Sequence, residues 1–452
     1  MATYYVATNG STLNPGTFDN PWRWPSQAVP QMVAGDVLNI RAGTYNDRLD
    51  STKITIPSGT SWLNAITIQA YQAEVAELHF TLGGGSGAIL NFADSALQYL
   101  IVKNLILNGS TTNDVVSFNN GARWIRLDGC EIKNAPNGQG VVMGAGTLTS
   151  PWQTFYEILN CSIHDNGSTS LDHGLYVRTS NNLIKGCTVF NNASFGIQCF
   201  VSSGNSSNNN TIDSNTFHSN SQAAGVSSSG ILLSSGNGNV AKNNFVYDEP
   251  YGITVHNNSP EDSLVYNNTV DDCTFAGLRA NSLSIRSIFR NNHATNCAQG
   301  LLIDSGATDT TYGNLNTWNS TTAVSDSGTG TVNELGNITT TPSYLDAPNR
   351  DYRIPTGSNS KDAGQTLASV DVDFFGVTRP QGASYDIGAH EFEVPPANPP
   401  VNTVPASQIV TTEVSTAIPV TVSDTDSDVT SIQVTVGHGT VDATVSGAAT
   451  IS

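Results

Sequence analysis

A histidine, a tyrosine and an arginine lie close together beside a glycine–aliphatic dipeptide near the middle of the chain: His173, Tyr176 and Arg178. Histidine and tyrosine side chains with shifted pKa values can exchange a proton with a substrate. An arginine can hold a carboxylate through two parallel hydrogen bonds. The set suits removal of a proton beside a sugar carboxylate, with His173 and Tyr176 as base and acid and Arg178 on the carboxylate.

Related side chains follow later copies of the same dipeptide. Aromatic rings, amides and cations along one groove suit an extended anionic sugar chain, and a second arginine offers an alternative carboxylate ligand. Each candidate also has an ordinary structural explanation: a turn hydrogen bond for a histidine, ion pairs for the arginines and surface stacking for the tyrosines. The candidate substrate-binding residues are Tyr251, His256, Arg279 and Gln198.

These residues converge only if the chain repeats in space. One sequence pattern recurs at spacings of roughly 25 to 30 residues. It begins with an apolar residue, has a Cys or Asn three positions later, and ends with a second apolar residue two positions after that. A glycine–aliphatic pair follows each copy, for example Gly174-Leu175 and Gly196-Ile197. The repeated Cys or Asn positions are Cys130, Cys161, Cys187, Asn215, Asn243, Asn268 and Asn291.

Short β-branched segments at this period cannot each bury an apolar face alone, but they can when stacked. The sequence therefore predicts an all-β parallel β-helix with coils ~4.8 Å apart, in which Ile158, Ile184 and Ile212 lie over one another in the core. The Cys and Asn positions then form a buried ladder of reduced thiols and amides. Alternate residues after each glycine point outward, so we expect the candidates to share one face. Insertions before Gly174 and Gly230 could form the walls of a cleft on that face.

Composition limits the partners. The 452 residues carry a formal charge of -19, with Lys+Arg 18 against Asp+Glu 37. A protein without a basic surface is not expected to bind nucleic acid or an anionic membrane surface. No apolar run approaches the roughly 18 to 20 residues that insertion into a membrane requires.

Two terminal motifs resemble those of exported right-handed parallel β-helix proteins, including pectate-lyase-like polysaccharide lyases. The resemblance implies a right-handed solenoid that acts on polysaccharide. It also implies a bacterial protein that is secreted or at the cell surface, with a signal peptide removed before Met1. The opening motif includes Tyr4-Tyr5-Val6, Asn14-Pro15-Gly16-Thr17 and Arg41-Ala42-Gly43-Thr44-Tyr45, and the closing motif includes Asp371 to Gly376, Arg379-Pro380 and Tyr385 to Glu391.

The chain divides into four expected parts. Residues 1–60 form a first strand and a helical cap over 25–33, 61–393 form the β-helix with its closing motif, and 394–400 are a proline-rich linker. Residues 401–452 resemble the start of a cadherin-like bacterial surface repeat, a truncated β-sandwich-like segment. Alternate aspartates there are candidate calcium ligands: Asp424, Asp426 and Asp428.

Two functions remain open from the sequence. One is a polysaccharide-active enzyme, most simply a lyase or epimerase that acts on an acidic polysaccharide by β-elimination or epimerisation. The other is a non-catalytic carbohydrate-binding or adhesive module, a monomeric β-helix within a large bacterial surface protein. The first requires the outward-facing candidates to converge on a groove, whereas the second requires only a stable rod.

Overall fold

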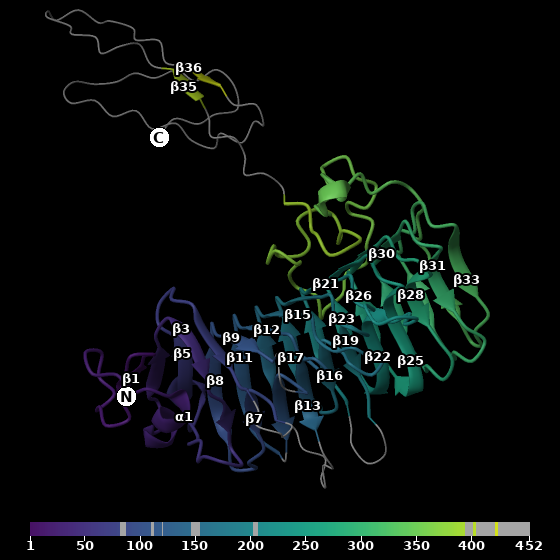
Figure 1. Cartoon of the computed structure of the whole chain (residues 1–452). Coiled ribbons are helices and arrows are strands. Elements are labelled where there is room, and N and C mark those ends of the chain that lie inside the picture. Colours follow the sequence, from purple (N-terminus) through teal and green to yellow (C-terminus); the bar gives the residue numbers. More distant parts are fainter. Residues whose placement is uncertain are drawn as a thin grey trace, which may run out of the picture. The chain divides into compact units, whose positions relative to one another are not determined.

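The computed structural model describes residues 1–81, 87–109, 113–119, 121–145, 154–201, 207–393, 401–403 and 421–423. Contacts divide the chain into two units, Met1–Phe392 and Glu393–Ser452. In the described part of the first unit, strands fall into three parallel sheets, A, B and C, and the chain visits them in that order in each coil (Figure 1). The predicted all-β parallel β-helix is confirmed.

Sheet A runs along one face of the coils, with every strand paired in parallel to its equivalent in the next coil. Its strands are β1 (Thr3–Val6), β2 (Val37–Ile40), β5 (Ile66–Ala70), β8 (Gln98–Lys103), β11 (Arg123–Asp128), β14 (Glu157–Leu159), β17 (Leu183–Lys185), β20 (Thr211–Asp213), β23 (Val240–Lys242), β26 (Leu264–Tyr266), β29 (Ile288–Arg290), β32 (Thr311–Gly313) and β34 (Val332–Asn333).

Sheet B follows sheet A after a tight corner in each coil. Its strands are β3 (Gly43–Asn46), β6 (Ala76–His79), β9 (Ile106–Asn108), β12 (Glu131–Lys133), β15 (Ser162–His164), β18 (Thr188–Phe190), β21 (Thr216–His218), β24 (Phe245–Tyr247), β27 (Thr269–Asp271) and β30 (His293–Thr295).

Sheet C contains the strands that start at or next to the repeated glycines. They are β4 (Leu49–Asp50), β7 (Leu90–Phe92), β10 (Val116–Asn119), β13 (Val141–Ala145), β16 (Leu175–Val177), β19 (Ile197–Cys199), β22 (Ser229–Asn237), β25 (Tyr251–Glu261), β28 (Ala276–Ala280), β31 (Gln299–Ile303) and β33 (Thr322–Asp326).

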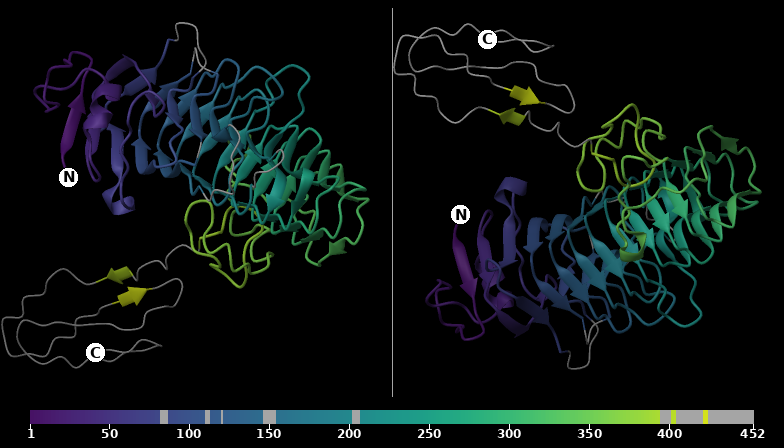
Figure 2. Two further views of the ribbon diagram at one scale, coloured as in Figure 1. Left: turned by 90° about the horizontal axis from the view of Figure 1, so that it is seen from below. Right: turned by 90° about the horizontal axis from the view of Figure 1, so that it is seen from above.

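The core is a set of aligned apolar columns. Ile158 pairs with Ile184, and Ile184 with Ile212, and all three side chains are completely buried. Like side chains therefore pack on like side chains along the axis, each contributing roughly 1.5–3 kcal/mol through burial. Figure 2 shows the coils following one another in sequence order along the axis.

The ladder between sheets A and B differs from the prediction by one residue in two coils. The Cys187 backbone N–H donates to Asn215 Oδ1, and Asn215 Nδ2 donates to Asn244 Oδ1, not to Asn243. Asn268 likewise continues to Asn292 rather than Asn291. The skipped residues, Asn243 and Asn291, have positive φ at the corner. Asparagine tolerates that left-handed conformation. Asparagine is therefore favoured both at the ladder position and at the corner position before it.

The one-residue error has a simple cause. In these coils the outward residues are also apolar, Val240 and Ile288, whereas the inward ones are Ala241 and Phe289, both completely buried. Strand alternation puts neighbouring residues on opposite faces, and hydrophobicity alone does not choose between two apolar neighbours.

A second ladder, between sheets B and C, was not predicted. Asn166 Nδ2 donates to Asn192 Oδ1, and Asn192 Nδ2 donates to Asn220 Oδ1. Asn220 Nδ2 then donates to Oε1 of Glu249, which occupies the next ladder position and is 1% exposed. A carboxyl group is thus buried inside the solenoid.

The first coil is covered as expected. Helix α1 (Pro25–Ala28), the 3₁₀ turn η1 (Val29–Gln31) and the residue after the turn bury Ala28, Val29 and Met32 against the core. Strand β1 pairs with β2 and β2 with β5, so residues 1–60 continue the same sheet as the later coils. The other short 3₁₀ turns are η2 (Trp62–Asn64) and η3 (Ala347–Asn349).

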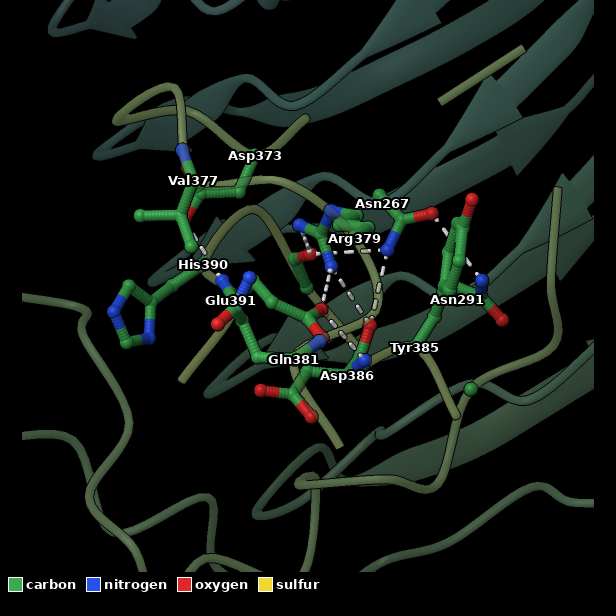
Figure 3. A network of polar contacts seen from close by, with 12 residues as sticks. Asn267, Asn291, Asp373, Val377, Arg379, Gln381, Tyr385, Asp386, His390 and Glu391 are labelled. Atoms are coloured by element: carbon green, nitrogen blue, oxygen red, sulfur yellow. Dashed lines mark hydrogen bonds and ion pairs between the residues drawn. The ribbon is translucent and has the colours of Figure 1, made fainter. Parts of the chain in front are cut away.

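The closing motif is held by one buried ion pair. Arg379 and Glu391 have side chains 0% and 1% exposed and lie 2.8 Å apart, and Arg379 also donates to the backbone oxygens of Asp386 and Gly388 (Figure 3). Asn267 Nδ2 donates to the same Asp386 oxygen at 3.0 Å. The ion pair therefore orders a segment that is fastened to the corner between sheets A and B.

In the second unit, β35 (Val401–Thr403) and β36 (Thr421–Ser423) form an antiparallel pair. The remaining residues of the expected cadherin-like segment, including Asp424, Asp426 and Asp428, lie outside the described residues. Among the helices that the structure describes, none has the length and apolar character to cross a lipid bilayer.

Candidate functional site

Three of the predicted site residues, Tyr176, Gln198 and Arg279, lie in one register column on the outer face of sheet C. Tyr176 pairs with Gln198 across β16 and β19, and Thr254 pairs with Arg279 across β25 and β28. The part of the column around these residues runs Val142, Tyr176, Gln198, Leu232, Thr254, Arg279 and Leu302. Pairing in register, rather than proximity in sequence, thus aligns the candidates.

Around β16 three of the candidates form a cluster. The His173 and Tyr176 rings meet edge to face, with centroids 5.4 Å apart and planes at 72°. The Phe195 ring also contacts the histidine edge to face, with centroids 5.2 Å apart. The Arg178 guanidinium lies 5.8 Å from the centre of the Tyr176 ring. The structure thus brings together the three residues predicted to carry the proton chemistry.

Burial determines the charge of the histidine. His173 is 3% exposed, and this burial lowers its pKa to about 4, against the opposing effects of Asp172 and of a hydrogen bond with Gln198. The imidazole is therefore neutral at pH 7, the form in which one ring nitrogen can accept a proton. Its Nδ1 has no hydrogen-bond partner among the residues that the structure describes.

The residues beside the histidine differ in exposure. Tyr176 is half-buried, which raises the pKa of its hydroxyl, while Arg178 lowers it. Within the described ranges, Arg178 Nε is buried without a hydrogen-bond partner. Tyr176 and Arg178 therefore present the polar groups of the cluster nearest to solvent, with His173 beneath them.

A second cluster lies further along sheet C. The Arg279 guanidinium is 4.8 Å from the centre of the Tyr251 ring and bonds to Asp304 Oδ2 through both Nε and Nη2, at 2.9 and 2.8 Å. Burial and Arg279 lower the pKa of His256. Asp304 therefore already compensates the charge of Arg279.

The two clusters do not form one continuous strip. Tyr176 and Arg279 are four strand spacings apart, ~19 Å. Between them, Leu232 and Thr254 point outward but are only 3% and 2% exposed. Ser229 Oγ donates to Thr254 Oγ1 at 2.8 Å, so this hydroxyl pair is satisfied within the protein. A single chemical step can involve only one of the clusters.

Sequence reasoning missed the residue that fixes the histidine backbone. The His173 N–H donates to Gln139 Oε1, and Gln139 Nε2 donates to the Leu171 backbone oxygen. Gln139 precedes Gly140 as His173 precedes Gly174, so the repeat contained the signal. Across the described ranges, no group of three or more His, Cys, Asp or Glu side chains is placed to hold a metal ion.

Comparison with known proteins identifies the family. The model of the Pel9A-like, right-handed β-helix region matches residues 4–250. The chain belongs to this family. A second description, right-handed β-helix region, matches residues 206–339. The resemblance to pectate-lyase-like β-helix proteins is thereby confirmed.

Solved structures resemble this Pel9A-like chain in fold. Pectate lyase Pel9A is 16% identical with a TM-score of 0.60, and the match covers 86% of this chain and 96% of that one. A rhamnogalacturonan lyase is 14% identical with a TM-score of 0.51, covering 84% and 99%. XylC in complex with xylose is 9% identical with a TM-score of 0.50, covering 86% and 98%.

Among curated proteins, the Pel9A-like chain matches the uncharacterized protein YwoF of Bacillus subtilis (strain 168). The two are 30% identical over 111 residues, which is 25% of this chain. The matched region spans 22% of the length of YwoF.

Proposed function

We propose that this protein acts on an acidic polysaccharide at the outer face of sheet C, by β-elimination or epimerisation. One observation carries the proposal: the neutral imidazole of His173 packs edge to face on Tyr176, with Arg178 beside the same ring. The pair of titratable groups differs in solvent access, and a cation lies next to them. This combination is typical of a site that moves protons near a carboxylate.

The chemistry needs three roles. Arg178 binds the uronate carboxylate and stabilises the negative charge that develops on it. His173, in its neutral form, accepts the proton from the carbon beside the carboxylate. In elimination the electron pair forms a carbon–carbon double bond, the glycosidic C–O bond breaks, and Tyr176 donates a proton to the leaving oxygen. In epimerisation a proton returns to the same carbon from the opposite face.

The relatives support the substrate class. Pectate lyase Pel9A and the rhamnogalacturonan lyase share the fold, and the family model takes its name from the former. Export to the bacterial surface and a monomeric state are parts of the same proposal. Calcium bound by Asp424, Asp426 and Asp428 is a separate proposal, based on alternate carboxylates in that segment.

A non-catalytic carbohydrate-binding module is the second candidate. Two observations favour it: the stretch between the clusters is covered at Leu232 and Thr254, and Arg279 is already paired with Asp304. A binding surface requires no proton transfer, and aromatic rings such as Tyr176 and Tyr251 can serve it. In this case the His173 cluster binds a sugar without changing it.

The two candidates are separated by product formation. Purified protein is incubated with polygalacturonate, alginate or rhamnogalacturonan, with and without calcium, while the ultraviolet absorbance of unsaturated uronates is recorded. Exchange of substrate protons with deuterated water reports epimerisation. We expect turnover of one glycan, reduced at least 100-fold in Tyr176→Phe and His173→Gln, because general acid–base groups contribute 10²–10⁴-fold.

Matched controls lie on other faces. Tyr5→Phe and His79→Gln remove the same groups from partly exposed positions in the first coils, and both are expected to retain activity. Retained activity in Tyr176→Phe and His173→Gln refutes the assigned roles. Binding of a glycan that is weakened by these changes, with no product or exchange from any substrate, selects the binding module instead.

A further inference from the structure

Sheet B carries a groove that is distinct from the sheet C clusters. Two cavities of about 420 and 390 Å³ share Thr216 and Phe374 in their linings. The first extends over Thr188 and Lys185, and the second over Tyr247 and the closing segment. Each volume falls within the range that small-molecule and sugar sites occupy in proteins.

The floor of the groove is a row of hydroxyl groups. Thr188 and Thr216 line the cavities and pair in register on β18 and β21, so their side chains are one coil apart, ~4.8 Å. Thr188 and Thr216 are half-buried. Thr188 lines the first cavity and Thr216 lines both, and no hydrogen bond of either hydroxyl occurs within the described ranges, so both hydroxyls remain available to a ligand.

The closing segment supplies an aromatic wall. Phe374 packs on Phe245 of β24 with ring centroids 4.4 Å apart, and the neighbouring Phe375 is 53% exposed. Asp373 fixes the turn, because its Oδ1 accepts hydrogen bonds from the N–H groups of Phe375 and Val377, both at 2.8 Å.

The buried network of the closing motif holds this wall in place. Asp373 Oδ2 accepts a hydrogen bond from the backbone N–H of Glu391, the partner of Arg379 in the buried ion pair. The same network surrounds Arg379 in Figure 3. The two phenylalanine rings are therefore presented by a rigid turn rather than by a free loop, which reduces the entropy lost when a ligand binds.

The charges around the groove are already compensated. Lys185 pairs with Asp213 at 3.1 Å, and Arg350 pairs with Asp248 at 2.6 Å.

At the outer edge, Arg353 bonds to Asp351 at 2.7 Å. The cations that line the two cavities are thus all paired, and they offer no free positive charge to an anionic ligand. Free hydroxyls beside an aromatic wall match an uncharged sugar, whose hydroxyl groups donate and accept hydrogen bonds and whose C–H face is apolar.

We propose that this groove binds an uncharged sugar chain that lies along the axis of the β-helix. Its sugars contact the hydroxyls of Thr188 and Thr216 and end against Phe374 and Phe375. The site is separate from the His173 cluster, so the protein can hold a neutral glycan while the sheet C face engages an acidic one. The proposal goes beyond the proposed function and does not depend on it.

Calorimetric titration of the purified protein with xylohexaose, cellohexaose, mannohexaose and hexagalacturonate tests the site. We expect at least one neutral probe to bind, and Thr216→Val and Phe375→Ala each to weaken it at least tenfold. Matched controls are Thr311→Val in β32 and Phe18→Ala, whose ring is 46% exposed near the first coil.

Three results overturn the proposal: no neutral probe binds, Thr216→Val and Phe375→Ala leave the affinity unchanged, or the two variants weaken hexagalacturonate instead of the neutral probes. Since Phe375 is largely exposed and Thr216→Val preserves volume, both variants are expected to fold, which near-ultraviolet circular dichroism verifies. His173→Gln must leave neutral-sugar affinity unchanged. Failure here is therefore distinguishable from failure of the sheet C function.

Discussion

Replacing Glu249 by glutamine should make the protein less sensitive to alkaline pH. The carboxyl lies in the ladder between sheets B and C, where its Oε1 accepts hydrogen bonds from Asn220 Nδ2 and N at 2.7 and 3.2 Å. Its Oε2 is buried and finds no partner in the described residues. Burial raises the pKa of Glu249 to about 8, Asn220 opposes the rise, and Asp248 adds to it.

The sign of the effect follows from proton linkage. The folded state keeps the proton up to a pH of about 8, whereas the unfolded chain releases it near the ordinary value of 4.5. The unfolded state therefore binds fewer protons between these values, and the free energy of unfolding decreases as pH rises through that window. At 1.36 kcal/mol per pH unit, the full loss is about 5 kcal/mol.

Urea unfolding of the wild type and of Glu249→Gln at pH 5, 7 and 9 measures this loss. We expect the variant to gain stability relative to the wild type as pH rises, by several kcal/mol between pH 5 and 9. Glu77→Gln, a partly exposed carboxyl on the outer face of sheet B, is the control and should not change the slope. If Glu249→Gln keeps the pH dependence of the wild type, the buried carboxyl is not the titrating group.

Three further predictions concern the ladders, the closing motif and the candidate site. Asn244→Ala leaves ladder partners unpaired and should reduce the free energy of unfolding by about 2–3 kcal/mol in urea titrations; an unchanged midpoint contradicts this. Arg379→Met leaves Glu391 buried without its cation, so it should cost about 3–5 kcal/mol and expose the closing segment to limited proteolysis. If His173 is the base, the acidic limb of kcat/KM should fall near pH 4, because burial lowers its pKa; a limb near pH 6.5 excludes it.

The repeat in the sequence was enough to predict the coils. Equivalent residues must lie over one another when each strand pairs with its counterpart, so the period defined the column of Ile158, Ile184 and Ile212. It also aligned Tyr176 with Gln198 on the outer face of sheet C. These predictions depend only on chain periodicity and on strand alternation, which are local properties.

The register within two coils was less certain from sequence. Val240 and Ala241 are both compatible with a core position, and Ile288 and Phe289 pose the same choice. The asparagine ladder determines the register, because Asn244 hydrogen-bonds to the equivalent residue of the next coil. This bond fixes which of the two apolar neighbours points into the core. A hydrogen bond between residues in different coils has no signature within either coil alone.

The sequence was enough to choose the residues of the candidate site, but it did not predict the surroundings of their side chains. The tertiary structure buries His173 in contact with two rings, pairs Arg279 with Asp304 and buries Leu232 and Thr254 between the clusters. The groove on sheet B exists because the segment that carries Phe374 packs beside strands that lie much earlier in the sequence. Solvent access, pKa and groove shape depend on atoms from several coils at once, so only the packed structure determines them.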